Sequence, residues 1–334
     1  MPEVYVIGVG MTRFGKYPEA TVKGLAAQAV REVLKDAGLR ASEIQSAYVS
    51  NSFWGMYTGQ HTIRGQVILH PLGIHGIPVI NTENACAGGS TAIQLAYAAV
   101  AAGLCDVALA LGVEKITHPD KSYSFRAYTS ALDVENLEAH LLTMLEVSRS
   151  LNLPLPPDET PPGEGRSIFM DLYAVMARWH MARYGTTQRQ LAVIAAKNHL
   201  HGSLNPLAQI QRRMTVEEVL ANVKVAYPLT RAMCSPVGDG AAAAILCSAS
   251  FLRKLPAARP VRVRASVLAS GTDRPIDAPD IAEKAAQRAY EMAGLGPADV
   301  NVAELHDATA FGELFQTEAM GFCSKGEGGA LAES

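Results

Sequence analysis

The chain has 334 residues, 49% hydrophobic and 18% charged, a composition that builds a folded core and excludes a disordered chain. Its formal net charge of −3 excludes a globally basic protein that would attract nucleic acid or anionic lipid. The five cysteines include no CxxC pair, so the sequence predicts neither a zinc site nor a disulfide framework and fits a reducing, cytoplasmic location.

The first 115 residues predict strands and helices in alternation. An apolar run that contains Glu3 is typical of a first strand rather than a signal peptide, and no apolar run approaches the roughly 20 residues of a membrane span. Apolar residues recur at helical spacing up to Gly38, which supplies a C-cap. This alternation predicts a sheet with helices on both faces. The expected strands are 4–9, 44–50, 78–81 and 106–111, and the expected helices are 21–37 and 90–102.

Residues 116–235 have a different character. The proline-rich stretch 150–165 predicts a surface loop, and helical patterns follow over 167–184 and 187–199. Thr215 and Glu218 form a capping-box pattern that begins another helix. We interpret this region as an insertion over the sheet.

The pattern then restarts. After a buried strand at 240–247, a strand is expected at 261–270, a helix at 281–293 and a strand at 301–305. Residues 34–50 also align without gaps on residues 290–306, with AGL at the end of the helix in both copies. The matched order of elements predicts two similar α/β halves.

The most specific local pattern is NTENACAGGS at 81–90, between an expected strand and an alanine-rich helix. Backbone N–H groups and the dipole at a helix N-terminus stabilise a thiolate, so Cys86 has the setting of an activated nucleophile. Gly88 and Gly89 allow a close approach by another backbone or a ligand. The plain alternative is a small buried cysteine with no chemistry.

Three stretches together resemble the thiolase superfamily, in its sterol-carrier-protein (lipid-transfer) branch. NACAGGSTA, followed by the strand DVALALGVEK, is similar to the thiolase nucleophile motif. GTTQRQLAVIAAKNH and the later YPLTRAMCSPVGDGAAAAIL resemble the segment that joins the insertion to the second half. ELHDATAFGELFQTEAMGFCSKGEGG resembles that branch's strand-HD-helix motif and the glycine-rich segment after it.

The resemblance implies an α/β thiolase fold, with two similar βαβαβαββ halves in a five-layered αβαβα arrangement and an inserted loop domain. Residues 1–115 and 236–250 would form the N-terminal half, 116–235 the loop domain and 251–334 an incomplete C-terminal half. It further implies a coenzyme A thioester as substrate, no cofactor and no metal. A homodimer is expected, as is a small OB-fold/zinc-ribbon partner found with several relatives.

By this resemblance Cys86 would attack the 3-keto carbon of an acyl-CoA, and His306 would help to form an oxyanion hole for the enolate oxygen. A positioned N–H donor aimed at developing charge supports such a role. We interpret Asp307 as the N-cap of the following helix and Asp239 as a structural residue of the turn before a buried strand. Cys234 and Cys323 correspond to packing or loop positions.

The sequence departs from the family in its second half, because no histidine follows His306 and no cysteine follows Cys323. The family's GHP-type histidine and CxG-type cysteine are therefore missing. We expect the sequence to be part of a longer chain; the alternatives are a degenerate member and completion of the site by a partner.

Three functions are compatible with these residues. The first is an acyl-CoA C-acyltransferase (thiolase) that cleaves or forms a 3-ketoacyl-CoA through an acyl-cysteine. The second is a thiolase-like retro-aldolase (lyase) that cleaves a β-hydroxyacyl-CoA such as a steroid side-chain intermediate. The third is a non-catalytic scaffold subunit that binds acyl-CoA. His306 favours the thiolase over the lyase, because the lyases tend to carry tyrosine there. The acyl group, the direction and the pathway are not specified.

Overall fold

The computed structural model describes residues 2–150, 165–255, 259–272 and 274–334. The chain divides into two compact units. Unit 1 comprises Met1–Pro119, Leu207–Gln209 and Val237–Leu268, and unit 2 comprises Asp120–Pro206, Ile210–Pro236 and Ala269–Ser334. The three-part division expected from the sequence stays a prediction.

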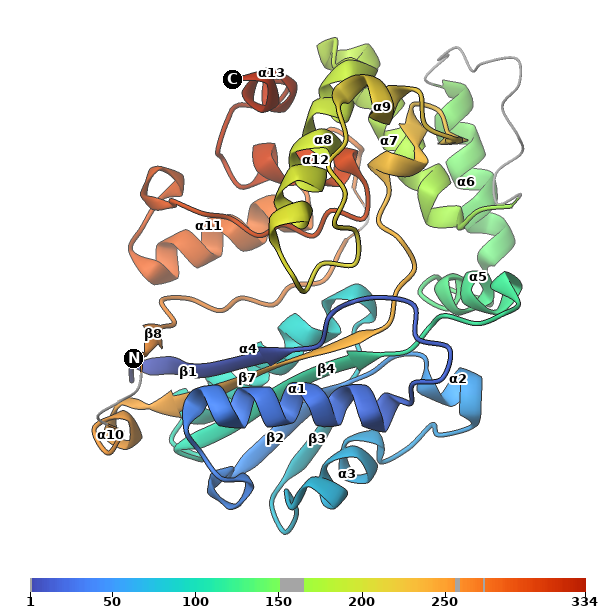
Figure 1. Ribbon diagram of the computed structural model, residues 1–334. Helices are drawn as coiled ribbons and strands as arrows, with labels where there is room; N and C mark the ends of the chain where they lie inside the picture. The colour runs from blue at the N-terminus through green and yellow to red at the C-terminus, as the bar shows by residue number, and fades with distance from the viewer. Residues whose placement is uncertain (1, 151–164, 256–258, 273) are drawn as a thin grey trace. The chain divides into compact units, whose positions relative to one another are not determined.

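Unit 1 is built around a mixed six-stranded sheet with the order β3-β2-β4-β7-β1-β8. β2 pairs in parallel with β3 and β4, whereas β7 is antiparallel to both β4 and β1. Helix α1 covers one face and α4 the other (Figure 1). The strands are β1 Val4–Met11, β2 Ser46–Ser50, β3 Val79–Thr82, β4 Val107–Glu114, β7 Gly240–Ser248 and β8 Val261–Arg262; the helices are α1 Val22–Ala37, α2 Trp54–Thr58, α3 Arg64–Leu69, α4 Gly88–Ala101 and α10 Ala249–Leu252.

The apolar stripe of α1 explains how this unit folds. Val22, Leu25 and Val30 face the sheet and are buried, as the helical spacing predicts. The Thr21 hydroxyl accepts a hydrogen bond from the Gly24 N–H and begins the helix. β2 is largely buried on both faces, which a strand between two parallel neighbours requires.

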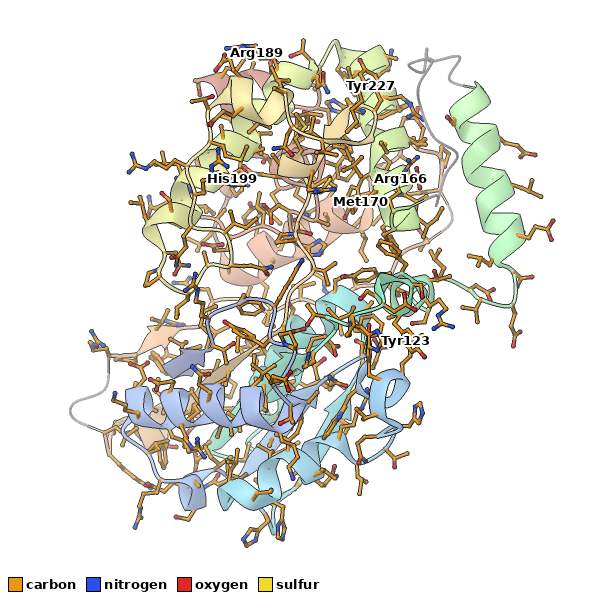
Figure 2. All side chains as sticks on the ribbon, turned by 45° about the vertical axis from the view of Figure 1, so that its right-hand side comes forward. Tyr123, Arg166, Met170, Arg189, His199 and Tyr227 are labelled. Atoms are coloured by element: carbon orange, nitrogen blue, oxygen red, sulfur yellow. The ribbon has the colours of Figure 1, made fainter. Side chains whose placement is uncertain are left out.

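Unit 2 is mainly helical. Its elements are α5 Lys121–Thr129, α6 Leu137–Ser150, α7 Ile168–Tyr184, α8 Gln188–Leu204, α9 Val216–Leu220, β5 Lys224–Ala226, β6 Leu229–Thr230, α11 Ile281–Ala293, α12 Ala310–Ala319 and α13 Gly328–Glu333. Its core joins α7 and α8 to α12, through buried residues that include Leu191, Phe311 and Leu314. Figure 2 marks α8 by Arg189 and His199, and the β5–β6 turn by Tyr227. The proline-rich loop predicted at 150–165 lies almost wholly outside the described residues.

The internal repeat is confirmed at its helix ends. Gly38 closes α1 and Gly294 closes α11, both in the left-handed region, with φ of 67° and 65°. A 3₁₀ turn then follows in each copy, Ala41–Glu43 in one and Pro297–Asp299 in the other. In each, the last carboxylate of the turn accepts the backbone N–H three residues before it, at 2.9 and 2.8 Å.

The sequence predicted two strands in the second half, at 261–270 and 301–305, and both predictions are wrong. Only Val261–Arg262 of the 261–270 stretch pairs, with β1, and 301–305 forms no ladder in the described part of the chain. A strand needs a hydrogen-bonded neighbour, which β2 finds in β3 and β4. Val302 is accordingly 83% exposed. The α/β class and the thiolase fold hold, while the five layers stay a prediction.

Candidate active site

Cys86 lies in unit 1, on a tight elbow between β3 and α4. Cys86 is the middle residue of a short 3₁₀ turn, Ala85–Ala87, and α4 begins at the residue directly after this turn. Ala85 has a φ of 43°, a conformation that costs a residue with a β-carbon about 1–2 kcal/mol. Strain of this kind collects at functional turns, because the surrounding structure must hold it in place. The elbow therefore presents Cys86 in a fixed, exposed position.

Close packing beneath the elbow holds the start of α4 against the sheet. A β-carbon on Gly88 would overlap the Ser50 hydroxyl at the end of β2. The expected close approach at this glycine is thus real, and its partner is a strand of the protein itself. On the other side, the Asn84 amide donates to the Thr91 hydroxyl at 2.9 Å, and that hydroxyl donates to the Ala87 carbonyl at 2.9 Å.

The electrostatics of Cys86 differ from the expectation. The residue as a whole is exposed, yet enough protein surrounds the sulfur to raise the pKa of the thiol above its ordinary value. A backbone hydrogen bond lowers the pKa, but by less than burial raises it. The thiol is therefore largely protonated at neutral pH, and its use as a nucleophile requires a base.

His306 lies in unit 2, in an exposed extended segment before α12. The Gln316 side chain of α12 donates to the His306 carbonyl and fixes the backbone there. A β-carbon on Gly312 would lie 3.5 Å from the same carbonyl, an ordinary van der Waals contact, so the segment packs closely on the helix at this residue. Cys86 thus belongs to one compact unit and His306 to the other.

The N-cap assigned to Asp307 is wrong. The Thr309 hydroxyl caps α12 by accepting from the Gly312 N–H, while Asp307 accepts from the Asn198 amide at 2.9 Å. Burial raises the pKa of Asp307, and the Glu313 carboxylate adds to the effect. The cap falls two residues later because Thr309 forms a β-bridge with Cys234, which keeps the segment extended up to the helix.

The other acidic and thiol residues singled out in the sequence are structural. Asp239 is fully buried and accepts the backbone N–H groups of Tyr17, Ile116 and Thr117 at 2.8–3.0 Å. Burial alone would raise its pKa, but these bonds and the Thr117 hydroxyl hold the pKa below its ordinary value. Burial raises the pKa of Cys234 to about 12 and that of Cys323 to about 11, so neither is an activated thiol.

Two buried polar clusters were not foreseen. In unit 1, Glu114 at the end of β4 accepts from the Ser52 N–H at 2.9 Å and the Asn51 amide at 3.0 Å, while burial raises its pKa. In unit 2, the His180 ring contacts Glu318 at 3.0 Å, and Glu318 accepts the Gly328 N–H of the glycine-rich segment at 2.9 Å. The sequence pattern that could have identified Glu114 is an acidic residue directly after an apolar strand.

Comparison with known proteins identifies the family. The profile of the thiolase N-terminal domain matches residues 4–152, and that of the thiolase C-terminal domain-like family matches residues 272–334. The benzoylsuccinyl-CoA thiolase subunit BbsB of Thauera aromatica is 38% identical, over 98% of this chain and 77% of the relative. The chain belongs to the thiolase superfamily. It is an enzyme of the acyltransferase type.

Other relatives agree with this placement. An acetyl-CoA acetyltransferase of Methanothermobacter thermautotrophicus is 36% identical, over the full chain and 81% of the relative. Sterol carrier protein 2 of Gallus gallus is 36% identical, over 97% of this chain and 57% of its own length. The solved structure of an Ltp2-ChsH2(DUF35) aldolase superimposes with a TM-score of 0.76 over 99% of this chain and 80% of its own, at 23% identity. That likeness shows the fold.

Within the described part of the chain, no group of three or more His, Cys, Asp or Glu side chains is arranged to hold a metal ion. No helix among the described residues has the length and apolar character needed to span a bilayer.

Proposed function

We propose that this thiolase cleaves or forms a 3-ketoacyl-CoA through an acyl-enzyme on Cys86. The observation that supports it most is the strained elbow, which exposes this cysteine at the start of α4 inside the matched thiolase N-terminal domain. The coenzyme A thioester is the substrate, and the chemistry calls for no further cofactor.

In the cleavage direction, the Cys86 sulfur attacks the 3-keto carbon and the bond between C2 and C3 breaks. The acyl group stays on sulfur, and the two carbons attached to coenzyme A leave as an enolate that takes a proton at C2. A second coenzyme A thiol then attacks the thioester and frees Cys86. We propose that His306 stabilises this enolate. Its ring N–H would donate a hydrogen bond to the thioester oxygen, on which negative charge develops. The raised pKa of Cys86 requires that a base remove its proton first.

The proposal includes partners. The Thauera relative is named as a subunit, and the solved aldolase structure combines Ltp2 with ChsH2, a DUF35 protein. We propose that this chain forms a homodimer and also binds a small protein of OB-fold and zinc-ribbon type. The activity assay is therefore run with and without such a partner.

The test is coenzyme A-dependent cleavage of straight-chain, branched and aromatic 3-ketoacyl-CoAs by the purified chain. Cys105 in the same unit provides a matched control, since its sulfur lies 3.1 Å from the Ser46 hydroxyl and away from the elbow. We expect Cys105→Ser to keep its activity and Cys86→Ser to lose roughly a thousandfold or more. Equal activity of Cys86→Ser would refute the covalent route.

A retro-aldol cleavage is the second candidate, because that reaction needs no thiolate and burial raises the pKa of the Cys86 thiol. Its test uses a β-hydroxyacyl-CoA as substrate and follows release of the ketone or aldehyde. Cleavage that survives in Cys86→Ser would support the lyase. The absence of any turnover, with acyl-CoA binding retained, would support the scaffold function.

A further inference from the structure

The segment directly before Cys86 is held by a carboxylate that the sequence did not single out. Glu83 Oε1 accepts the backbone N–H of Ala85 at 2.6 Å. The same oxygen accepts the Ser52 hydroxyl at 2.9 Å. Glu83 thus joins the strained residue of the elbow to the loop that follows β2, 31 positions earlier in the chain.

The Ser52 end of this connection is itself anchored in the sheet. Its backbone N–H donates to Glu114 Oε2 at 2.9 Å, and Asn51 donates to the other Glu114 oxygen at 3.0 Å. Asn51 is buried, and its amide also donates to the Val113 carbonyl at 2.9 Å. A continuous hydrogen-bonded path therefore runs from the end of β4 through Ser52 and Glu83 to Ala85.

We propose that Glu83 is a positioning residue for the Cys86 nucleophile. The φ of 43° at Ala85 carries a steric cost, and the short bond to Glu83 satisfies the Ala85 N–H in that conformation. Without an acceptor at Glu83, the elbow relaxes and the Cys86 sulfur moves relative to its substrate. This inference rests on the proposed role of Cys86 as nucleophile.

Two substitutions of Glu83 distinguish the effect of its hydrogen-bond acceptor from the effect of its negative charge. Glu83→Gln keeps an oxygen that can accept from both Ala85 and Ser52, whereas Glu83→Ala removes the acceptor. A displaced nucleophile lowers the rate of the chemical step more than it weakens binding. We expect Glu83→Ala to lower kcat by roughly 10- to 100-fold with KM changed less than about threefold, and Glu83→Gln to recover kcat to within about threefold of the wild type.

Glu43 is the matched control, because it is also a carboxylate of unit 1 that accepts a backbone N–H, that of Arg40 at 2.9 Å. Glu43→Ala should leave kcat unchanged. An unchanged kcat in Glu83→Ala, or an equal loss in Glu83→Gln, would overturn the inference.

A second measurement does not depend on the reaction. Amide hydrogen exchange in the intact chain should be faster at residues 84–88 in Glu83→Ala, and close to wild type in Glu83→Gln and Glu43→Ala. If the wild type shows no thiolase activity but exchange changes as stated, the proposed function fails and the positioning of the elbow stands. Unchanged exchange in Glu83→Ala would overturn the positioning itself.

Discussion

Replacing Gly88 by alanine tests how tightly the start of α4 packs on the sheet beneath the nucleophile. The added β-carbon would overlap the Ser50 hydroxyl and lie 3.3 Å from the Ser50 β-carbon. Ser50 is buried and lies in β2, so the clash is relieved by rotating its hydroxyl within a packed site or by shifting α4 away from the strand. Overpacking of this kind lowers the free energy of unfolding by about 1–3 kcal/mol.

The next residue provides an internal control. A β-carbon on Gly89 meets no atom within 4 Å, and its backbone is helical. Alanine there improves helix propensity by up to about 1 kcal/mol. Two neighbouring substitutions of the same kind should therefore differ by about 1–4 kcal/mol, with Gly88→Ala the less stable protein.

Denaturant unfolding read by tryptophan fluorescence measures this difference. The protein has two tryptophans, and Trp54 lies in unit 1 while Trp179 lies in unit 2. A Trp179→Phe background therefore makes the signal report on unit 1. Adding Ser50→Ala removes the overlapping oxygen and should restore at least about 1 kcal/mol to Gly88→Ala in a double-mutant cycle. Equal stability of the two glycine variants, or no recovery with Ser50→Ala, would refute the packing described.

Four further substitutions follow from three buried polar residues, Asp239, Glu318 and Thr82. Asp239→Ala leaves three backbone N–H groups, of which that of Ile116 is buried, without their acceptor and also removes the ion-pair partner of Lys115. It should lower the free energy of unfolding by about 3–5 kcal/mol in the same assay. The folded pKa of Asp239 is below its ordinary value, so the carboxylate stabilises the fold above the unfolded pKa of about 4, and this stability is lost as the pH falls. Asp239→Asn should therefore flatten the acid side of the stability profile, and an unchanged slope would contradict this. Glu318 has a lowered pKa for a similar reason, because bonds from His180 and two backbone N–H groups outweigh its burial, and Glu318→Gln should flatten the same limb. Thr82→Val removes a buried hydroxyl that has no partner among the described residues, and should raise Tm through a gain of about 1 kcal/mol; a loss would mean that the hydroxyl is satisfied.

Patterns local in the chain were the ones that the sequence predicted well. The helical spacing and the caps at Gly38 and Thr215 depend on residues within a few positions of each other, and all are formed. The repeat could be found for the same reason, since its turn at Gly294 uses the same local bonds.

What failed depended on distant parts of the chain. The 301–305 stretch aligns with the β2 region in the internal repeat, but a strand exists only where a neighbour supplies hydrogen bonds. The cap of α12 moved to Thr309 because Cys234, far away in sequence, pairs with it. The raised pKa of Cys86 comes from the protein packed around its sulfur, and the role of Glu83 depends on Ser52. Neither contact can be read from spacing.

The central claim is that Cys86 carries the acyl group, and the mass of the intact protein after brief exposure to acyl-CoAs of several lengths tests it most directly. We predict a gain equal to one acyl group in the wild type and in Cys105→Ser, and no gain in Cys86→Ser. Because the thiol must lose its proton, the gain should form faster as the pH rises toward the raised pKa of Cys86. The same gain in Cys86→Ser, or none in the folded wild type with any acyl-CoA, would contradict the account.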